Sequence, residues 1–191
     1  MQTIFNYSNS IINEANLGFK RYLFHKINWK PRLIEILGAR GVGKTTLMLQ
    51  KAKLLNAAKP NQAVYLSLDD KLLYTNSIVD LAEELDKYDV RYLFLDEVHK
   101  YPPKHKDYDW SAEIKNIYDR FPSLRIIYSG SSVLKIYKAH GDLSRRKSTY
   151  RLFGLRIAIV HFTWILWLRA TPMRCSIHAP CGKLIQDAYG L

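Results

Sequence analysis

The sequence predicts an α/β fold in which a mainly parallel sheet lies between layers of helices. Up to about residue 155 of the 191, short apolar runs alternate with runs of helical periodicity, as strand–helix–strand units require. A glycine-rich segment, 38–45, follows the first apolar run and opens a helical one. Two adjacent acids, Asp96 and Glu97, follow a later apolar run that is expected to be a strand.

Each expected element rests on a local pattern. Strands are expected at 33–37, 64–68, 92–95 and 124–128, with a weaker signal for a fifth at 149–153. Helices are expected at 44–55, 77–87 and 110–121. The run LIEIL at 33–37 is short, apolar and followed by glycine, which is typical of a buried strand. Ile78, Leu81 and Leu85 recur at helical spacing, and Ser77 is suited to cap that helix.

The composition is that of an ordinary globular protein, with 48% hydrophobic and 24% charged residues. The formal charge of +12 bears by itself on solubility and nonspecific association rather than on function. The N-terminus lacks a secretory signal pattern, and the longest apolar run, 157–168, is shorter than the roughly 18–20 residues of a membrane span. Two cysteines are too few for a disulfide framework. We therefore expect a soluble, cytoplasmic protein without a membrane partner.

Three segments are distinguished along the chain. Residues 1–30 are interpreted as a lead-in segment, 31–155 as the α/β domain and 156–191 as an atypical tail. The tail carries four basic residues, one acid and both cysteines, and it shows no helical or strand period. This change of character favours a frameshifted or truncated product whose last residues do not fold.

The segment from Gly38 to Thr45 fits the pattern G-x-x-x-x-G-K-[ST] of a phosphate-binding P-loop. The glycines let the backbone curl so that its N–H groups point at phosphate oxygens, and the helix N-terminus adds positive charge. Lys44 is expected to neutralise the β- and γ-phosphates, and the Thr45 hydroxyl to bind Mg²⁺. The predicted nucleotide-binding residues are Gly38, Ala39, Arg40, Gly41, Val42, Gly43, Lys44, Thr45 and Thr46. The alternative is a glycine turn that caps an ordinary helix.

Asp96 and Glu97 come directly after the apolar run YLFL. We predict that Asp96 holds Mg²⁺, mostly through water, and that Glu97 polarises the water that attacks the γ-phosphate. Adjacent residues leaving a strand face opposite ways, so the two carboxylates can serve separate roles. The alternative is a pair of acids that caps the next helix. His99 follows closely and is assigned no role.

Ser129 stands at the end of the fourth expected strand, in the run SGSS. We predict that its hydroxyl senses the γ-phosphate or holds the attacking water, with Ser131 as the second choice. The alternative is a turn in which serine and glycine satisfy local backbone groups.

Five runs taken in order resemble the AAA+ type P-loop ATPases predicted in bacteria and archaea, whose longer members carry a nuclease-like C-terminal domain; the runs are GARGVGKTTLML, YLSLDD, FLDEVHKY, IIYSGSS and GDLSRR. The resemblance covers about Ile34 to Arg146. It implies a three-layer P-loop NTPase sandwich of the additional-strand type, with strand order 5-1-4-3-2, and ATP rather than GTP. It also implies that Arg145 or Arg146 stabilises γ-phosphate charge, across the subunit interface of a homo-oligomer. A solvated basic surface is the alternative for these arginines.

The sequence thus predicts a protein that binds ATP and hydrolyses it with Mg²⁺ to drive a conformational change in an unidentified partner or a missing domain. The predicted catalytic residues are Lys44, Glu97, Ser129 and Arg145. Two alternatives stay open: a nucleotide-dependent phosphotransferase with a basic lid from Arg145 to Lys147, and an inactive, truncated ATP-binding remnant. Seven basic residues from Lys135 to Arg156 also leave nucleic-acid binding open.

Overall fold

The computed structural model describes residues 1–70, 77–100, 110–130, 143 and 145–154. Met1–Gly154 form one compact unit. The tail at 156–191, and with it the expectation of a frameshift, lies outside the described residues. So do Ser131 and the basic segment from Lys135 up to residue 142.

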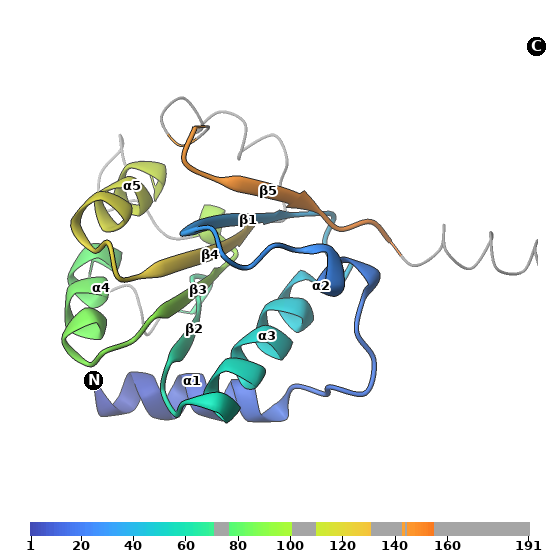
Figure 1. Ribbon diagram of the computed structural model, residues 1–191, viewed down its shortest axis with the longest axis horizontal. Helices are drawn as coiled ribbons and strands as arrows, with labels where there is room; N and C mark the ends of the chain where they lie inside the picture. The colour runs from blue at the N-terminus through green and yellow to red at the C-terminus, as the bar shows by residue number, and fades with distance from the viewer. Residues whose placement is uncertain (71–76, 101–109, 131–142, 144, 155–191) are drawn as a thin grey trace, which may run out of the picture. The chain divides into compact units, whose positions relative to one another are not determined.

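Five strands form a single parallel sheet in the order β2-β3-β4-β1-β5 (Figure 1). Their bounds are β1 (Leu33–Leu37), β2 (Ala63–Ser67), β3 (Tyr92–Asp96), β4 (Arg125–Gly130) and β5 (Ser148–Arg151). Strand β4 lies between β1 and β3, which is the additional strand of the expected topology. The predicted P-loop NTPase fold and the strand order 5-1-4-3-2 are therefore confirmed.

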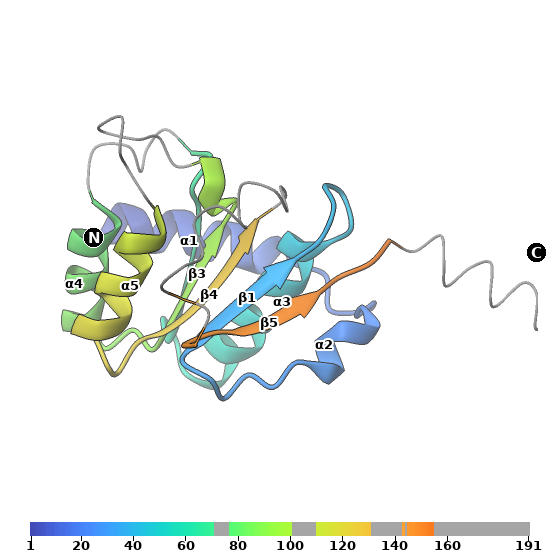
Figure 2. The same ribbon diagram turned by 90° about the horizontal axis from the view of Figure 1, so that it is seen from above.

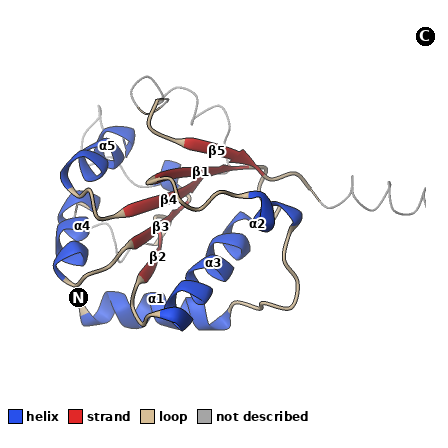
Figure 3. Ribbon diagram, in the orientation of Figure 1, coloured by secondary structure: helices blue, strands red, loops and turns tan. Residues whose placement is uncertain are grey.

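Helices cover both faces and one edge of the sheet (Figure 2). Over one face lie α2 (Tyr22–Lys26) and α3 (Lys44–Ala58), and over the other α4 (Ile78–Lys87) and α5 (Trp110–Arg120). At the edge, α1 (Gln2–Glu14) packs against β2 and α3. A short 3-10 turn, η2 (Val98–Lys100), follows β3. The result is the three-layer arrangement seen in Figure 3.

The expected strands and helices are present, with ends that differ by no more than three residues. Ser77 caps α4 as predicted, because its side chain accepts a hydrogen bond of 3.1 Å from the Val79 amide. The helices α1 and α2 are additional findings, since no helix is expected in residues 1–30. In the described part of the chain, no helix combines the length and the apolar character that crossing a bilayer demands.

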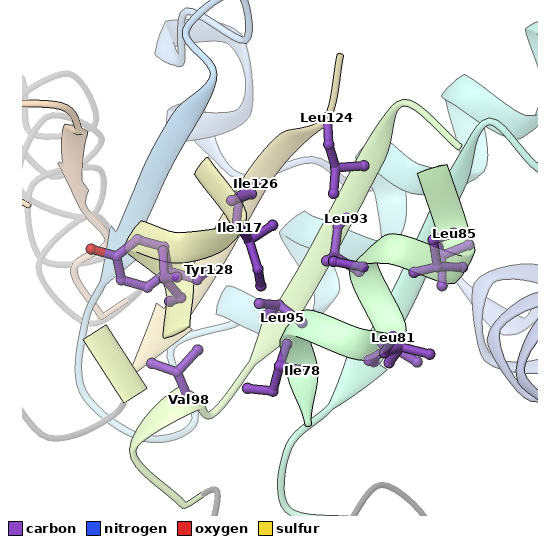
Figure 4. Packing of buried hydrophobic residues seen from close by; sticks show 14 of the residues in the cluster. Ile78, Leu81, Leu85, Leu93, Leu95, Val98, Ile117, Leu124, Ile126 and Tyr128 are labelled. Atoms are coloured by element: carbon purple, nitrogen blue, oxygen red, sulfur yellow. The ribbon is translucent and has the colours of Figure 1, made fainter. Parts of the chain in front are cut away.

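Each face of the sheet packs its own hydrophobic cluster. On one face, drawn in Figure 4, Leu93 and Leu95 of β3 meet α4 and α5. On the other, Phe94 of β3 and Ile127 of β4 belong to the same cluster as Leu47 of α3. Because both faces are covered, the central strands are apolar nearly throughout. Two buried carboxylates, Glu35 of β1 and Asp96 of β3, interrupt this pattern.

Candidate nucleotide-binding site

The loop between β1 and α3 lies at the carboxyl edge of the sheet. Gly41 and Gly43 have φ values of 78° and 93°, in the left-handed region that glycine adopts without strain. A Cβ at either position would meet nothing within 4 Å. A Cβ on Gly38, in contrast, would lie 2.5 Å from the backbone oxygen of Leu152. The loop is therefore tightly packed where it leaves β1 and open around its later glycines, while Arg40 and Thr46 are exposed to solvent.

Lys44, the first residue of α3, lies across this loop. Its side chain is buried, and Nζ donates hydrogen bonds of 3.0 Å to the carbonyl oxygens of Gly38 and Ala39. Burial lowers the pKa of Lys44, and the nearby charges of Glu97 and Asp96 partly oppose that effect. A buried ammonium bonded to neutral carbonyls gains from an anionic partner, so the loop fits a phosphate group.

Asp96 ends β3 and is only 2% exposed. Its Oδ2 accepts hydrogen bonds from Thr45 Oγ1 at 2.5 Å and from Tyr65 Oη at 2.9 Å. Its Oδ1 accepts from the Ser129 hydroxyl and from the Glu97 amide, the latter at 3.0 Å. A carboxylate and a threonine hydroxyl at this distance are oxygen donors of the kind that Mg²⁺ prefers, so Thr45 and Asp96 fit that ion.

Glu97 turns the chain sharply away from β3. Its φ of 54° is unusual for a residue with a side chain, and such backbone strain is often stored at functional sites. Its Oε2 lies 3.3 Å from Nε2 of His99, whose side chain is 9% exposed. His99 therefore contacts the carboxylate that the sequence predicts to activate water. The only signal for it in the sequence is its position two residues after Glu97.

Ser129 is fully buried on β4, between the P-loop strand and the Asp96 strand. Its hydroxyl donates to Asp96, and its oxygen lies 3.4 Å from the Glu97 amide nitrogen. Four of the predicted residues, Thr45, Asp96, Glu97 and Ser129, are thus joined by hydrogen bonds. Tyr65 belongs to the same network, although no pattern in the sequence indicates it.

The basic residues before β5 are arranged differently. Arg145 and Arg146 are exposed, and Nε of Arg146 lies 3.6 Å from the Asp119 carboxylate on α5. The side chain of Lys147 is 8% exposed, and its Nζ lies 2.9 Å from the Glu35 carboxylate on β1. Lys147 is therefore part of the interior rather than of a basic surface.

Two cavities lie near the carboxyl edge of the sheet. One, of about 230 Å³, lies between the P-loop and the end of β5, and is lined by Leu37, Gly38, Ala39, Val42, Arg151, Leu152, Phe153 and Gly154. The other, of about 450 Å³, is lined by Tyr7, Ser67, Asp69 and Asp70. Burial and a hydrogen bond with Asp70 raise the pKa of Tyr7 to about 12. Lys100 Nζ lies 2.6 Å from Asp69, so this second cavity holds acids that already have partners.

The chain is similar to several known proteins. The uncharacterized protein MJ1637 of Methanocaldococcus jannaschii is 34% identical to it over 129 residues, which are 62% of this chain and 25% of that protein. Among solved structures, PCH-2 of C. elegans has a TM-score of 0.45 at 15% identity, covering 93% of this chain and 50% of that one. AMPPCP-bound DnaA from Aquifex aeolicus has a TM-score of 0.48 at 17% identity, covering 85% and 52%.

This chain spans a quarter of that curated relative and about half of each solved chain. A family model described as "AAA domain" matches residues 30–159. That range is more than half of the 191 residues, and it contains the P-loop, the acids Asp96 and Glu97, and the five strands of the sheet. The chain therefore belongs to the AAA domain family of P-loop ATPases.

Proposed function

We propose that this chain binds ATP and Mg²⁺ at the P-loop and hydrolyses the ATP, and that hydrolysis drives a conformational change in a partner or a further domain. The observation that supports this most is the 2.5 Å contact between Thr45 on α3 and Asp96 on β3. These two residues are 51 positions apart in the chain, and both supply oxygen ligands suited to Mg²⁺.

Each residue of the site has a proposed task. Lys44 neutralises the β- and γ-phosphates, together with the loop amides and the N-terminus of α3. Thr45 and Asp96 hold the metal ion. Mg²⁺, when bound, neutralises charge on the phosphate oxygens. Ser129 holds the Asp96 carboxylate and, in the proposed role, lies near the γ-phosphate or the attacking water.

Glu97 is proposed as the base. Its carboxylate accepts a proton from the water whose oxygen attacks the γ-phosphorus, while the bond from that phosphorus to the bridging oxygen breaks. His99 Nε2, 3.3 Å from Glu97 Oε2, limits the positions that this carboxylate can adopt. Glu97 has a left-handed backbone, whereas Asp96 is the last residue of the extended strand β3.

We assign the nucleoside half of ATP to the cavity of about 230 Å³ beside the P-loop. The cavity shares Gly38 and Ala39 with the loop, so a ligand can occupy both. Its lining is largely apolar, as is common for ligand pockets, and Phe153 offers an exposed aromatic ring.

Arg145, as an exposed residue, is available to stabilise γ-phosphate charge across a homo-oligomer interface. The ion pair of Lys147 with Glu35 makes it unsuited to a phosphotransferase lid or to a nucleic-acid surface. Location in the cytoplasm stays a prediction, and an inactive remnant stays the alternative to an active ATPase.

The proposal is tested with the variant Lys44→Ala. Loss of the ammonium is expected to weaken binding of a fluorescent ATP analogue roughly 100-fold, since hydrogen bonds to charged groups contribute about 1.5–3 kcal/mol each. Phosphate release from ATP should then be lost, while the wild type shows it.

The matched control is Lys53→Ala, on the same helix. Lys53 Nζ also donates to two backbone carbonyls, those of Asn13 and Ala15, at 2.7 and 2.8 Å. Its loss should leave nucleotide affinity unchanged. Equal binding by wild type and Lys44→Ala would contradict the proposal, whereas binding without phosphate release by the wild type would favour the inactive remnant.

A further inference from the structure

Tyr65 carries a hydroxyl group into the interior at the candidate metal site. It lies on β2, is 3% exposed, and its Oη donates to Asp96 Oδ2 at 2.9 Å. In the sheet register Tyr65 lies opposite Phe94 of β3, so Asp96 is the next residue of β3 on the same face. A tyrosine side chain is long enough to reach such a diagonal neighbour.

The Asp96 carboxylate is held from several elements at once. Among the described residues, its side-chain donors are Thr45 from α3, Ser129 from β4 and Tyr65 from β2. Thr45 and Ser129 have proposed tasks toward the metal ion and the phosphate. Tyr65 bonds to the same oxygen as Thr45 and has no such task.

Tyr65 is itself fixed by α1. Its backbone amide points away from β3, at the outer edge of β2, and donates a 2.8 Å hydrogen bond to the hydroxyl of Ser8. Ser8 is fully buried on α1. The edge of the sheet is therefore closed at this point by a specific side-chain contact, which helps to place the tyrosine ring.

We propose that Tyr65 is a positioning residue, whose hydroxyl orients the Asp96 carboxylate for Mg²⁺ and whose own place is set by Ser8 of α1. The inference rests on the proposed function, because it assumes that Asp96 holds the metal ion. Residues that hydrogen-bond to a metal-binding side chain typically lower metal affinity 10- to 100-fold when they are replaced.

The test compares Tyr65→Phe with Tyr128→Phe. Tyr128 is fully buried and its hydroxyl donates to the Glu35 carboxylate at 3.0 Å, on the opposite face of the sheet. Each substitution removes one tyrosine–carboxylate hydrogen bond and keeps the aromatic ring. Binding of a fluorescent, non-hydrolysable ATP analogue is measured in EDTA and then across a Mg²⁺ titration, with thermal unfolding recorded for both variants.

Tyr65→Phe should bind the analogue in EDTA as the wild type does. The Mg²⁺ concentration that gives half of the metal-dependent change in binding should rise roughly 10- to 100-fold. Tyr128→Phe should keep the wild-type midpoint. An unchanged midpoint in Tyr65→Phe, or an equal shift in Tyr128→Phe, would overturn the inference.

A second variant, Ser8→Ala, tests the inference even if Tyr65→Phe does not fold. Ser8→Ala keeps the tyrosine hydroxyl and removes the acceptor of the Tyr65 amide, so it should shift the Mg²⁺ midpoint in the same direction by a smaller factor. If Tyr65→Phe does not fold, an unchanged midpoint in Ser8→Ala overturns the inference. A wild type that binds no nucleotide would instead refute the proposed function.

Discussion

Two carboxylates are buried in the sheet, and they face opposite layers of helices. Glu35 on β1 is 1% exposed and has a cation beside it, because Lys147 Nζ lies 2.9 Å away. It also accepts hydrogen bonds from the hydroxyls of Tyr128 at 3.0 Å and Thr149 at 2.8 Å. Its charge is compensated inside the protein, between β1 and β5.

Asp96 on β3 is equally buried, but its described donors are neutral: three hydroxyls and one backbone amide. A buried ion is costly unless it is paired, and hydroxyl groups compensate it less well than an ammonium does. This difference in partners is consistent with the proposal that Asp96 holds a metal ion, whereas Glu35 already forms an ion pair with Lys147. The two carboxylates are similarly buried and differ in the charge of their described partners.

The largest effect is expected for Glu97→Gln, next to Asp96 after β3. Removing the proposed base should lower ATP turnover roughly 100- to 10,000-fold, while ATP binding is retained, because the amide keeps the size of the side chain but accepts no proton. Phosphate release and analogue binding measure the two effects. Glu83→Gln, at an exposed acid of α4, serves as the control and should change neither. Full turnover in Glu97→Gln would disprove its role as base.

The next effect is on the free energy of unfolding, which should differ between variants of Glu35 and of Asp96. Glu35→Gln leaves the largely covered Lys147 ammonium without its counter-ion and should lower the free energy of unfolding by up to about 3–5 kcal/mol. Asp96→Asn should cost less, because the hydroxyls around it can rotate to new partners. Denaturant unfolding followed by circular dichroism gives both values. Equal losses would show that the partners of the two carboxylates do not differ as we infer.

The smallest effect is expected at Gly38, where the P-loop meets the end of β5. A Cβ there would lie 2.5 Å from the Leu152 backbone oxygen, so Gly38→Ala should lower the free energy of unfolding by about 1–3 kcal/mol. Gly154→Ala is the matched control, since a Cβ at that position meets nothing within 4 Å. Similar unfolding curves for the two variants would mean that the close approach is relieved without cost.

Much of the sheet and the site could be predicted from local patterns. The run LIEIL, the glycine motif and the acids after YLFL each have a physical cause that acts over a few residues. Residues 1–30 give no clear helical pattern, because the buried face of α1 consists of Phe5, Ser8 and Ile12, and the serine interrupts its apolar stripe. That serine is buried because it bonds to the Tyr65 amide at the sheet edge.

Tyr65 itself carries no sign of its role in the sequence, since a tyrosine in a buried strand is typical of a core residue. Its contact with Asp96 depends on the pairing of β2 with β3. The ion pair of Glu35 with Lys147 is likewise not indicated by the sequence. Lys147 belongs to a run of basic residues that suggests a surface, yet the pairing of β5 with β1 brings its ammonium to a carboxylate 112 positions away.

The sequence by itself determined the fold class, the strand order implied by its resemblance, and which residues are chemically able to hold phosphate and Mg²⁺. These properties depend on residue type and short-range spacing. Only the tertiary structure decided that Tyr65 and Ser129 hold Asp96, that His99 contacts Glu97, and that Lys147 neutralises Glu35. Most of these contacts join segments that are neighbours in the sheet but distant in the chain. The contact between His99 and Glu97 lies within one turn, where Glu97 has a left-handed backbone.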